Sequence, residues 1–262
     1  MRGARAYSGV DPYTGLGRTI NIEAGVIQSD EPCIAEGLPI FSPGLIDLQV
    51  NGYGGHDLND GELSAGTVEA LSEDLCRVGI AAYLPTLITA DKISICRRLS
   101  AIREASEKLP YSRQMIAGIH IEGPHISSKD GPRGAHPREH IRPPSMEEFE
   151  SWQEAAGGLV SMITIAPELD GAIDYLRQIA KRGVIVSLGH SDASEEDIYK
   201  ATDAGARMST HLGNGLSATL PRHPNVVWAQ LAEDRLSASL ILDGHHLPSS
   251  TAQVMIRAKG IE

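Results

Sequence analysis

Residues 115–125 read MIAGIHIEGPH and show the most informative feature of the chain. An apolar run of β-type residues leads directly into a carboxylate, Glu122. Two later stretches repeat the arrangement with an imidazole: VIVSLGHSD carries His190, and MSTHLGNG carries His211. Potential metal ligands at the ends of several strands are what a parallel barrel gathers at one rim, where such proteins keep their active sites.

The chain alternates between strand-like runs and amphipathic helices from about residue 40 onward. This rhythm predicts a parallel sheet with right-handed crossovers. Ser145-x-x-Glu148 and Ser194-x-x-Asp197 are typical of helix N-termini. A seventh and last helix is expected at about Ser250–Ala258. The expected strands are Leu45–Val50, Ala81–Leu87, Ile116–Ile121, Ser161–Ala166, Val184–Leu188, Arg207–Thr210 and Leu236–Leu242.

The count of seven strand–helix units decides between two architectures. A (β/α)8 barrel closes with eight strands, and the chain reaches Glu262 where the eighth would begin. An open doubly wound sheet tolerates edges, but it places its site at one switch point, whereas candidate residues here follow nearly every strand. The sequence therefore predicts an α/β fold, an incomplete TIM-type barrel over residues 43–262 that lacks its last strand. Residues 1–42, with short alternating pieces at 19–22 and 25–27, predict part of a small β domain.

Composition excludes several classes of partner. The 34 acidic against 23 basic residues give a net charge of −11, which disfavours nucleic acids and anionic membranes. No stretch approaches the roughly 20 apolar residues of a membrane span, and the N-terminus has no signal-peptide core. The three cysteines form no CxxC, which indicates free thiols in a reducing compartment. A cytoplasmic protein is expected.

Glu122, His190 and His211 form the central group of candidate residues. A carboxylate and two imidazoles with an open coordination position suit hydrolytic chemistry at Zn²⁺ or Fe²⁺. Nine of the 10 histidines lie between residues 120 and 246, which adds to the case. Gln49 and Asn51 should both face the barrel interior, but neutral amides are poor ligands for a transition metal. We therefore expect one divalent ion, with these amides hydrogen-bonded in the barrel mouth.

His120 shares a face with Glu122 but lies deeper, so we expect it to be packed rather than ligating. The loops offer groups for a substrate. His136, in a long polar loop, could polarise a substrate carbonyl. Arg222 could pair with a phosphate, and so could the backbone N–H groups at Asn214 and Gly215. The DGHH stretch at 243–246 offers one or two imidazoles.

Several motifs in order resemble the N-acetylglucosamine-6-phosphate deacetylase family, a branch of the metal-dependent amidohydrolase superfamily. They run from about Pro43 to the C-terminus: PGLIDLQVNGYGG, GIHIEGPHI, RGAH, TIAPE, SLGHSD, THLGNG and DGHH. The resemblance implies that the metal ligands are Glu122, His190 and His211. It implies a role in holding the sugar phosphate and its acetamide for Ala135, His136, Asn214, Gly215, Arg222 and His246. It also implies a homodimer for the full-length protein.

The implied reaction removes the acetyl group of N-acetylglucosamine 6-phosphate, giving glucosamine 6-phosphate and acetate, with His136 stabilising the developing oxyanion. Two departures from the family stand out. The motif usually written HLxNAM is HLGNGL here, and the general acid/base aspartate that ends strand eight falls beyond Glu262. We therefore interpret the chain as the N-terminal part of a longer protein. The alternatives are an amidohydrolase acting on a cyclic amide and a non-catalytic fragment.

Overall fold

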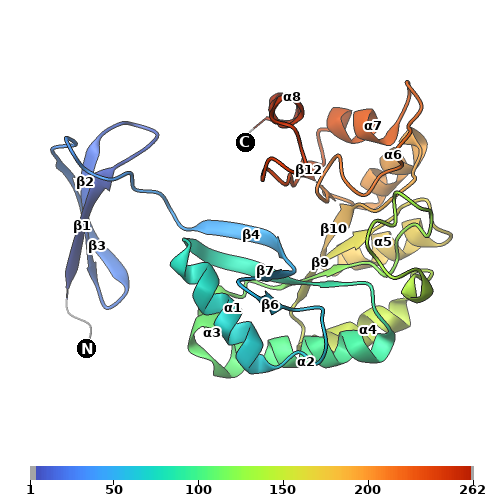
Figure 1. Ribbon diagram of the computed structural model, residues 1–262, viewed down its shortest axis with the longest axis horizontal. Helices are drawn as coiled ribbons and strands as arrows, with labels where there is room; N and C mark the ends of the chain where they lie inside the picture. The colour runs from blue at the N-terminus through green and yellow to red at the C-terminus, as the bar shows by residue number, and fades with distance from the viewer. Residues whose placement is uncertain (1–3, 261–262) are drawn as a thin grey trace. The chain divides into compact units, whose positions relative to one another are not determined.

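The computed structural model describes residues 4–260 of the chain (Figure 1). The backbone falls into two compact units, a short one that ends at Leu45 and a larger one that begins at Ile46. Each unit is built on its own sheet. Among residues 4–260, none of the helices combines the length and the apolar character needed to span a bilayer.

The N-terminal unit is an antiparallel sheet in the order β1-β2-β3, as predicted for a small β domain. Its strands are β1 (Arg5–Val10), β2 (Gly17–Glu23) and β3 (Val26–Cys33). A two-residue turn joins β2 to β3, because Glu23 pairs with Val26. Ala24 and Gly25 in this turn have φ values of 51° and 83°, the left-handed backbone that two-residue hairpins need. Gly25 was expected to begin a strand and lies in the turn instead.

The larger unit holds a seven-stranded sheet in the order β12-β11-β10-β9-β8-β7-β4. The pairs from β7 to β12 are parallel, as the strand–helix alternation predicts. The strands are β4 (Leu45–Val50), β7 (Ile80–Ile88), β8 (Ile119–Glu122), β9 (Val160–Ile165), β10 (Ile185–Leu188), β11 (Met208–Ser209) and β12 (Ser237–Ala238). A separate hairpin pairs β5 (Gly52–Tyr53) with β6 (His56–Asp57).

The sheet curls without closing, so the described part of the chain forms an incomplete barrel. Its outer strands, β4 and β12, each have one neighbour (Figure 1). The helices are α1 (Ala65–Arg77), α2 (Lys92–Lys108), α3 (Pro110–Met115), α4 (Met146–Ala156), α5 (Ala172–Lys181), α6 (Glu195–Ala204), α7 (Val226–Ala232) and α8 (Ser249–Lys259), with a 3-10 turn at Arg138–His140. An apolar core fills the space between sheet and helices, with Tyr83, Phe149 and Trp152 among its largest fully buried side chains.

Local sequence signals explain where several helices begin and end. Ser145 accepts a hydrogen bond from the backbone N–H of Glu148, and Ser194 with Asp197 forms a complete capping box. Both N-caps were predicted from the sequence. Helix α4 ends at Gly157, which takes the left-handed conformation (φ 62°) common at helix C-termini.

Two expected strands are wrong in part. The strand expected over Ile116–Ile121 is continuous only from Ile119, although Ile116, which directly follows helix α3, forms an isolated parallel bridge with Tyr83. Pro110 at the first turn suits a helix, and the Glu69 carboxylate accepts hydrogen bonds from the free N–H groups of Tyr111 and Ser112. The strand expected over residues 236–242 shrinks to the two residues of β12, which has a hydrogen-bonding neighbour on one side only.

The exposed edge of β4 leads to a prediction about association. Leu45 and Ile46 are 60% and 67% exposed, and an open apolar edge strand pairs readily with another chain. We expect the 262-residue chain to self-associate and Ile46→Lys to raise its monomer fraction in light scattering. The matched control is Ile93→Lys on helix α2, where Ile93 is 70% exposed but has no strand edge. An equal gain from both substitutions would show that the β4 edge is not the cause.

Candidate metal centre

Three strand ends bring the predicted ligands together at the carboxyl edge of the sheet. Glu122 is the last residue of β8, and His190 and His211 each follow a strand, β10 and β11, by two residues. The Nε2 atoms of His190 and His211 lie 3.3 Å and 2.9 Å from Glu122 Oε1, and 3.1 Å from each other. All three side chains are less than 10% exposed. A carboxylate and two imidazoles therefore share one small, nearly dry space.

Backbone strain marks the same two histidines. His190 and His211 have φ values of 51° and 31°, a left-handed conformation that costs a non-glycine residue free energy and is found mainly where function requires it. The preceding residue Gly189 has no room for a side chain, because a Cβ there would lie 2.9 Å from Thr210 Cβ. The turn that follows His190 is held by Glu168 of the TIAPE motif, which accepts hydrogen bonds from the Ser191 hydroxyl and the Asp192 N–H.

The charge state of Glu122 follows from its neighbours. Burial alone would raise the pKa of this carboxyl, but hydrogen bonds and charge from His190 and His211 outweigh burial and hold the pKa well below its ordinary value. The group is therefore an anionic carboxylate at neutral pH. Gln49 also donates a hydrogen bond from its side-chain amide to Glu122 Oε1, at 2.9 Å. This contact agrees with the expected role of Gln49 as a hydrogen-bonding group in the barrel mouth.

The donor set fits a divalent metal ion. His190 Nδ1 lies 2.9 Å from the carbonyl oxygen of Pro132, and a carbonyl only accepts. In the neutral ring the proton is therefore on Nδ1, which leaves a lone pair on Nε2 for an ion at the centre. His211 Nδ1 is buried and has no hydrogen-bond partner among residues 4–260. The His211 ring is therefore held by the contacts of its Nε2 atom with Glu122 and His190. One carboxylate and two imidazoles are a ligand set typical of Zn²⁺ and Fe²⁺ sites.

His136 comes to the same centre from the loop after β8. Its Nε2 lies 3.3 Å from His190 Nε2 and 3.9 Å from Glu122 Oε2. Burial lowers the pKa of His136 to about 4, so the ring is neutral at neutral pH. Glu122, His136 and His190 by themselves offer ligand atoms that all lie within 4.8 Å of one another. Geometry alone thus offers two candidates, His136 and His211, for the third ligand, and the shorter contacts of His211 favour it.

Two glycines in different loops pack against His190. A Cβ on Gly134 would lie 3.3 Å from His190 Cε1, and one on Gly215 would lie 3.0 Å from His190 Nδ1. Both have positive φ, 57° and 60°. Gly215 was predicted as a substrate-binding residue, whereas the role of Gly134 in packing was missed. The glycines of the RGAH and HLGNG motifs indicate that the backbone of each loop approaches another group closely. In the structure this group is the His190 ring.

The other predicted binding residues surround the centre less tightly. Asn214 is half-buried and donates to the carbonyl oxygen of His211. Ala135 and Arg222 are exposed. His246 is exposed as well, and its ring Nδ1 lies 2.7 Å from the Asp243 carboxylate. The structure thus brings His136 to the predicted ligands, and leaves the other polar groups in flanking loops.

A row of buried side chains linked by hydrogen bonds lies inside the barrel, and the sequence did not predict it. His120 Nε2 contacts Thr164 Oγ1 at 2.7 Å, and Thr164 contacts Thr210 Oγ1 at 2.6 Å. Thr210 in turn contacts Ser187 Oγ at 2.6 Å. The four side chains are at most 2% exposed and come from β8, β9, β10 and the end of β11. His120 is thus packed and hydrogen-bonded, and burial lowers its pKa to about 4.

The long loop after β8 is fixed to the scaffold by a buried ion pair. Arg142 donates to the Glu148 carboxylate, with Nε at 2.9 Å from Oε2, and to the carbonyl oxygen of Ala90 at 2.8 Å. Glu148 is 2% exposed. Removing one member of such a pair leaves a buried charge alone, which costs several kcal/mol. The loop that carries His136 is therefore anchored at its far end.

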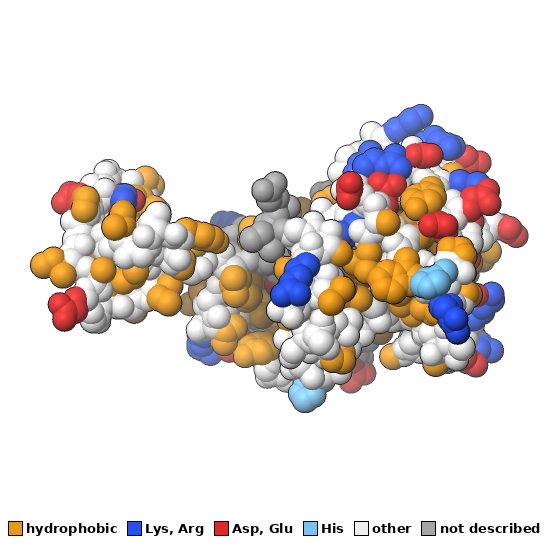
Figure 2. All heavy atoms as spheres, turned by 90° about the horizontal axis from the view of Figure 1, so that it is seen from above, with side chains coloured by type: hydrophobic (Ala, Val, Ile, Leu, Met, Phe, Trp, Pro, Cys, Tyr) orange, Lys and Arg blue, Asp and Glu red, His pale blue; other side chains and the backbone are white. Residues whose placement is uncertain are grey.

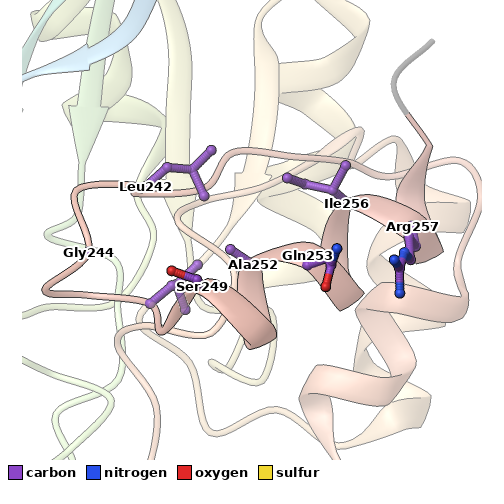
Figure 3. Close-up of a pocket in the computed structure, with 8 residues that line it drawn as sticks. Leu242, Gly244, Ser249, Ala252, Gln253, Ile256 and Arg257 are labelled. Atoms are coloured by element: carbon purple, nitrogen blue, oxygen red, sulfur yellow. The ribbon is translucent and has the colours of Figure 1, made fainter.

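A surface pocket lies apart from this site. A pocket along α8 is lined mainly by apolar side chains such as Leu242, Ala252 and Ile256, with Arg257 as its one charged group (Figure 3). None of the residues at the centre lines it. On the face shown in Figure 2, basic and acidic side chains are interspersed and form no continuous basic patch.

The sequence matches known proteins over most of its length. The model of a family described as the amidohydrolase family matches residues 40–259. The chain is 37% identical over 223 residues to N-acetylglucosamine-6-phosphate deacetylase from Bacillus subtilis, covering 84% of this chain. It is 38% identical over 249 residues to N-acetylgalactosamine-6-phosphate deacetylase from Shewanella, covering 95% of this chain. The chain spans 55% and 60% of the length of these two relatives.

Solved structures give the same result for the fold. The crystal structure of N-acetylglucosamine-6-phosphate deacetylase from Thermotoga maritima superposes with a TM-score of 0.81 at 30% identity. The match covers 97% of this chain and 66% of that one. The predicted TIM-type barrel of the amidohydrolase kind, incomplete in this chain, is confirmed.

The centre predicts one transition-metal ion per chain. His190→Ala or His211→Asn should each remove most of the bound metal, because each variant deletes one of three converging donors. The measurement is elemental analysis of purified protein after dialysis, with exposed His245→Asn as the matched control. Two tightly bound ions in the unchanged protein, or full metal content in both ligand variants, would contradict this assignment.

Proposed function

Because the chain belongs to the amidohydrolase family, whose members depend on metal ions, we propose that it contributes the metal centre of a deacetylase acting on N-acetylglucosamine 6-phosphate. The products are glucosamine 6-phosphate and acetate. The observation that carries this proposal is the convergence of Glu122, His190 and His211 beside the neutral ring of His136. Two relatives named N-acetylglucosamine-6-phosphate deacetylase each match 84% of this chain.

One divalent ion, zinc or iron, is held by Glu122, His190 and His211 in this proposal. Such an ion lowers the pKa of a bound water and polarises a carbonyl. The protein's part is to keep the three donors in place. Gln49 orients the Glu122 carboxylate, the Pro132 carbonyl orients His190, and the glycines of the flanking loops close around the His190 ring.

His136 meets the acetamide carbonyl in this proposal. A neutral imidazole within a buried site can donate a hydrogen bond to the oxygen on which negative charge develops, and removing one such donor typically costs a factor of about 10²–10³ in rate. Asn214, Gly215, Ala135 and His246 contact the sugar and its acetamide. Arg222, which is exposed and therefore free to meet a ligand, pairs with the 6-phosphate.

The general acid/base is expected from a carboxylate that follows an eighth strand, as the family resemblance implies. The sheet formed by residues 4–260 has seven strands and does not include it. Such a group contributes roughly 10²–10⁴-fold to a rate. We therefore expect the 262-residue chain alone to work more slowly than a relative with a closed barrel by about this factor.

A second candidate substrate is N-acetylgalactosamine 6-phosphate. The Shewanella relative named for it is matched over 95% of this chain, against 84% for the Bacillus subtilis relative. The two sugars differ only in the configuration of one hydroxyl group, so the same metal centre serves either. We also propose that the protein lies in the cytoplasm, which the free state of Cys33, Cys76 and Cys96 supports, and that it is a homodimer when full length.

The proposed activity is tested by acetate release from the two phosphorylated sugars, with the Bacillus subtilis relative as positive control. We expect slow release by the chain that disappears in Glu122→Gln, which keeps the shape of the side chain and loses its charge. Release that persists at the same rate in Glu122→Gln, or no release from either sugar at high protein concentration, would contradict the proposal.

Arg222→Ala should weaken the use of the phosphorylated sugar selectively. A charge-assisted contact to phosphate is worth about 1.5–3 kcal/mol, so kcat/KM should fall about 10- to 100-fold. The unphosphorylated sugar has no group for Arg222 and should be used as poorly as before. Exposed Arg177→Ala on helix α5 is the control. Equal losses on both sugars would argue against a phosphate contact.

A further inference from the structure

His136 and His190 present the same atom to the same centre but have opposite partners behind them. Their Nε2 atoms are 3.3 Å apart. The Nδ1 of His190 faces the carbonyl oxygen of Pro132, which only accepts a hydrogen bond. The Nδ1 of His136 faces Thr89 instead, whose hydroxyl lies at 2.8 Å and whose backbone N–H points at the same nitrogen from 3.4 Å. These partners decide which ring nitrogen of each histidine carries the proton.

A backbone N–H can only donate, so the His136 Nδ1 that faces it must accept. In a neutral imidazole one nitrogen carries the proton and the other carries a lone pair. The proton of His136 is then on Nε2, the atom that faces the centre. The Thr89 hydroxyl, which rotates freely, adds a second donor at Nδ1. His190 is assigned the opposite tautomer by the Pro132 carbonyl, with its lone pair at Nε2.

We propose that Thr89 is a positioning residue that fixes His136 in the tautomer with its proton on Nε2. This proton keeps His136 out of the ligand set of the metal and makes the ring a hydrogen-bond donor aimed into the site. The statement about the ring proton stands on the contacts of Thr89 alone. Its consequence, a donor to the substrate carbonyl, rests on the proposed function.

The contact between Thr89 and His136 is built into the sheet. Ile88 at the end of β7 pairs with Glu122 at the end of β8, so the next residues, Thr89 and Gly123, lie side by side. Thr89 is 1% exposed. Gly123 has a φ of 81°, and a Cβ at this position would lie 2.2 Å from the Thr89 hydroxyl oxygen. The glycine thus leaves the space that the hydroxyl needs.

The tautomer resolves the choice between His136 and His211 as the third ligand. Glu122, His136 and His190 are close enough to hold an ion, but a protonated Nε2 has no lone pair to offer. Moving the proton to Nδ1 would place two N–H groups face to face, because the Thr89 backbone N–H cannot turn away. His211 has no such partner at its Nδ1 among the described residues, so its Nε2 remains available.

The direct test is the nitrogen spectrum of His136 in protein with ¹⁵N-labelled histidine and bound zinc. Long-range proton–nitrogen correlation distinguishes the two tautomers without any substrate. We expect the Nε2–H pattern in the unchanged protein, in Thr89→Ser and in Thr89→Val, because the backbone N–H that faces Nδ1 is kept in both variants. An Nδ1–H pattern in the unchanged protein or in Thr89→Val would overturn the proposal.

Two further readouts separate this proposal from the proposed function. Metal content should stay at one ion in Thr89→Ser and Thr89→Val, whereas loss of the ion in His136→Asn would show that His136 is a ligand and overturn the proposal. With the phosphorylated sugar, Thr89→Val should lower kcat on the order of 10-fold with little change in KM, and Thr89→Ser should restore it. Absence of acetate release from the unchanged protein would overturn the deacetylase function and leave the tautomer assignment in force.

Discussion

One buried carboxylate, Glu122, and the two imidazoles that face it lie at the centre of the carboxyl edge of the sheet. An ionised group out of water is costly unless charge and hydrogen bonds meet it. Here the Gln49 amide donates to one carboxylate oxygen, and the Nε2 atoms of His190 and His211 lie 3.3 Å and 2.9 Å from the same oxygen. Both histidines have a left-handed backbone at this point. A metal ion is the cation that this donor set suits.

Hydrogen bonds inside the barrel and in the loop after β8 hold the elements that carry the centre. The chain from His120 through Thr164 and Thr210 to Ser187 links neighbouring strands just where their ends carry the ligands. Each of these buried groups has a partner, so the hydrogen bonds offset the cost of burial. The loop side is held by Arg142 and its ion pair. The side chains of the centre are thus held by contacts that involve both the strands and the loop after β8.

Much of the fold and part of the site could be predicted because their signals are local. Apolar runs ending in Glu122, His190 and His211 located the strand ends, and parallel strands bring their ends to one edge. The capping box at Ser194 is likewise readable within four residues. The roles of Thr89, Gly134 and the hydroxyl chain could not be predicted, because their partners are about 20 to 56 residues away in the sequence. The sequence alone also does not distinguish a threonine with such a partner from any other threonine in a strand. The short β12 and helix α3 were misjudged because edge position and the Glu69 cap are tertiary features.

We propose that Glu122, His190 and His211 hold one ion while His136 faces it as a hydrogen-bond donor. The most direct measurement is a crystal structure of the metal-loaded protein, with anomalous diffraction recorded at the absorption edge of the bound metal. We expect one anomalous peak in contact with those three side chains, with His136 Nε2 outside the coordination sphere. A peak coordinated by His136 in place of His211, or a second peak near Gln49 and Asn51, would contradict it.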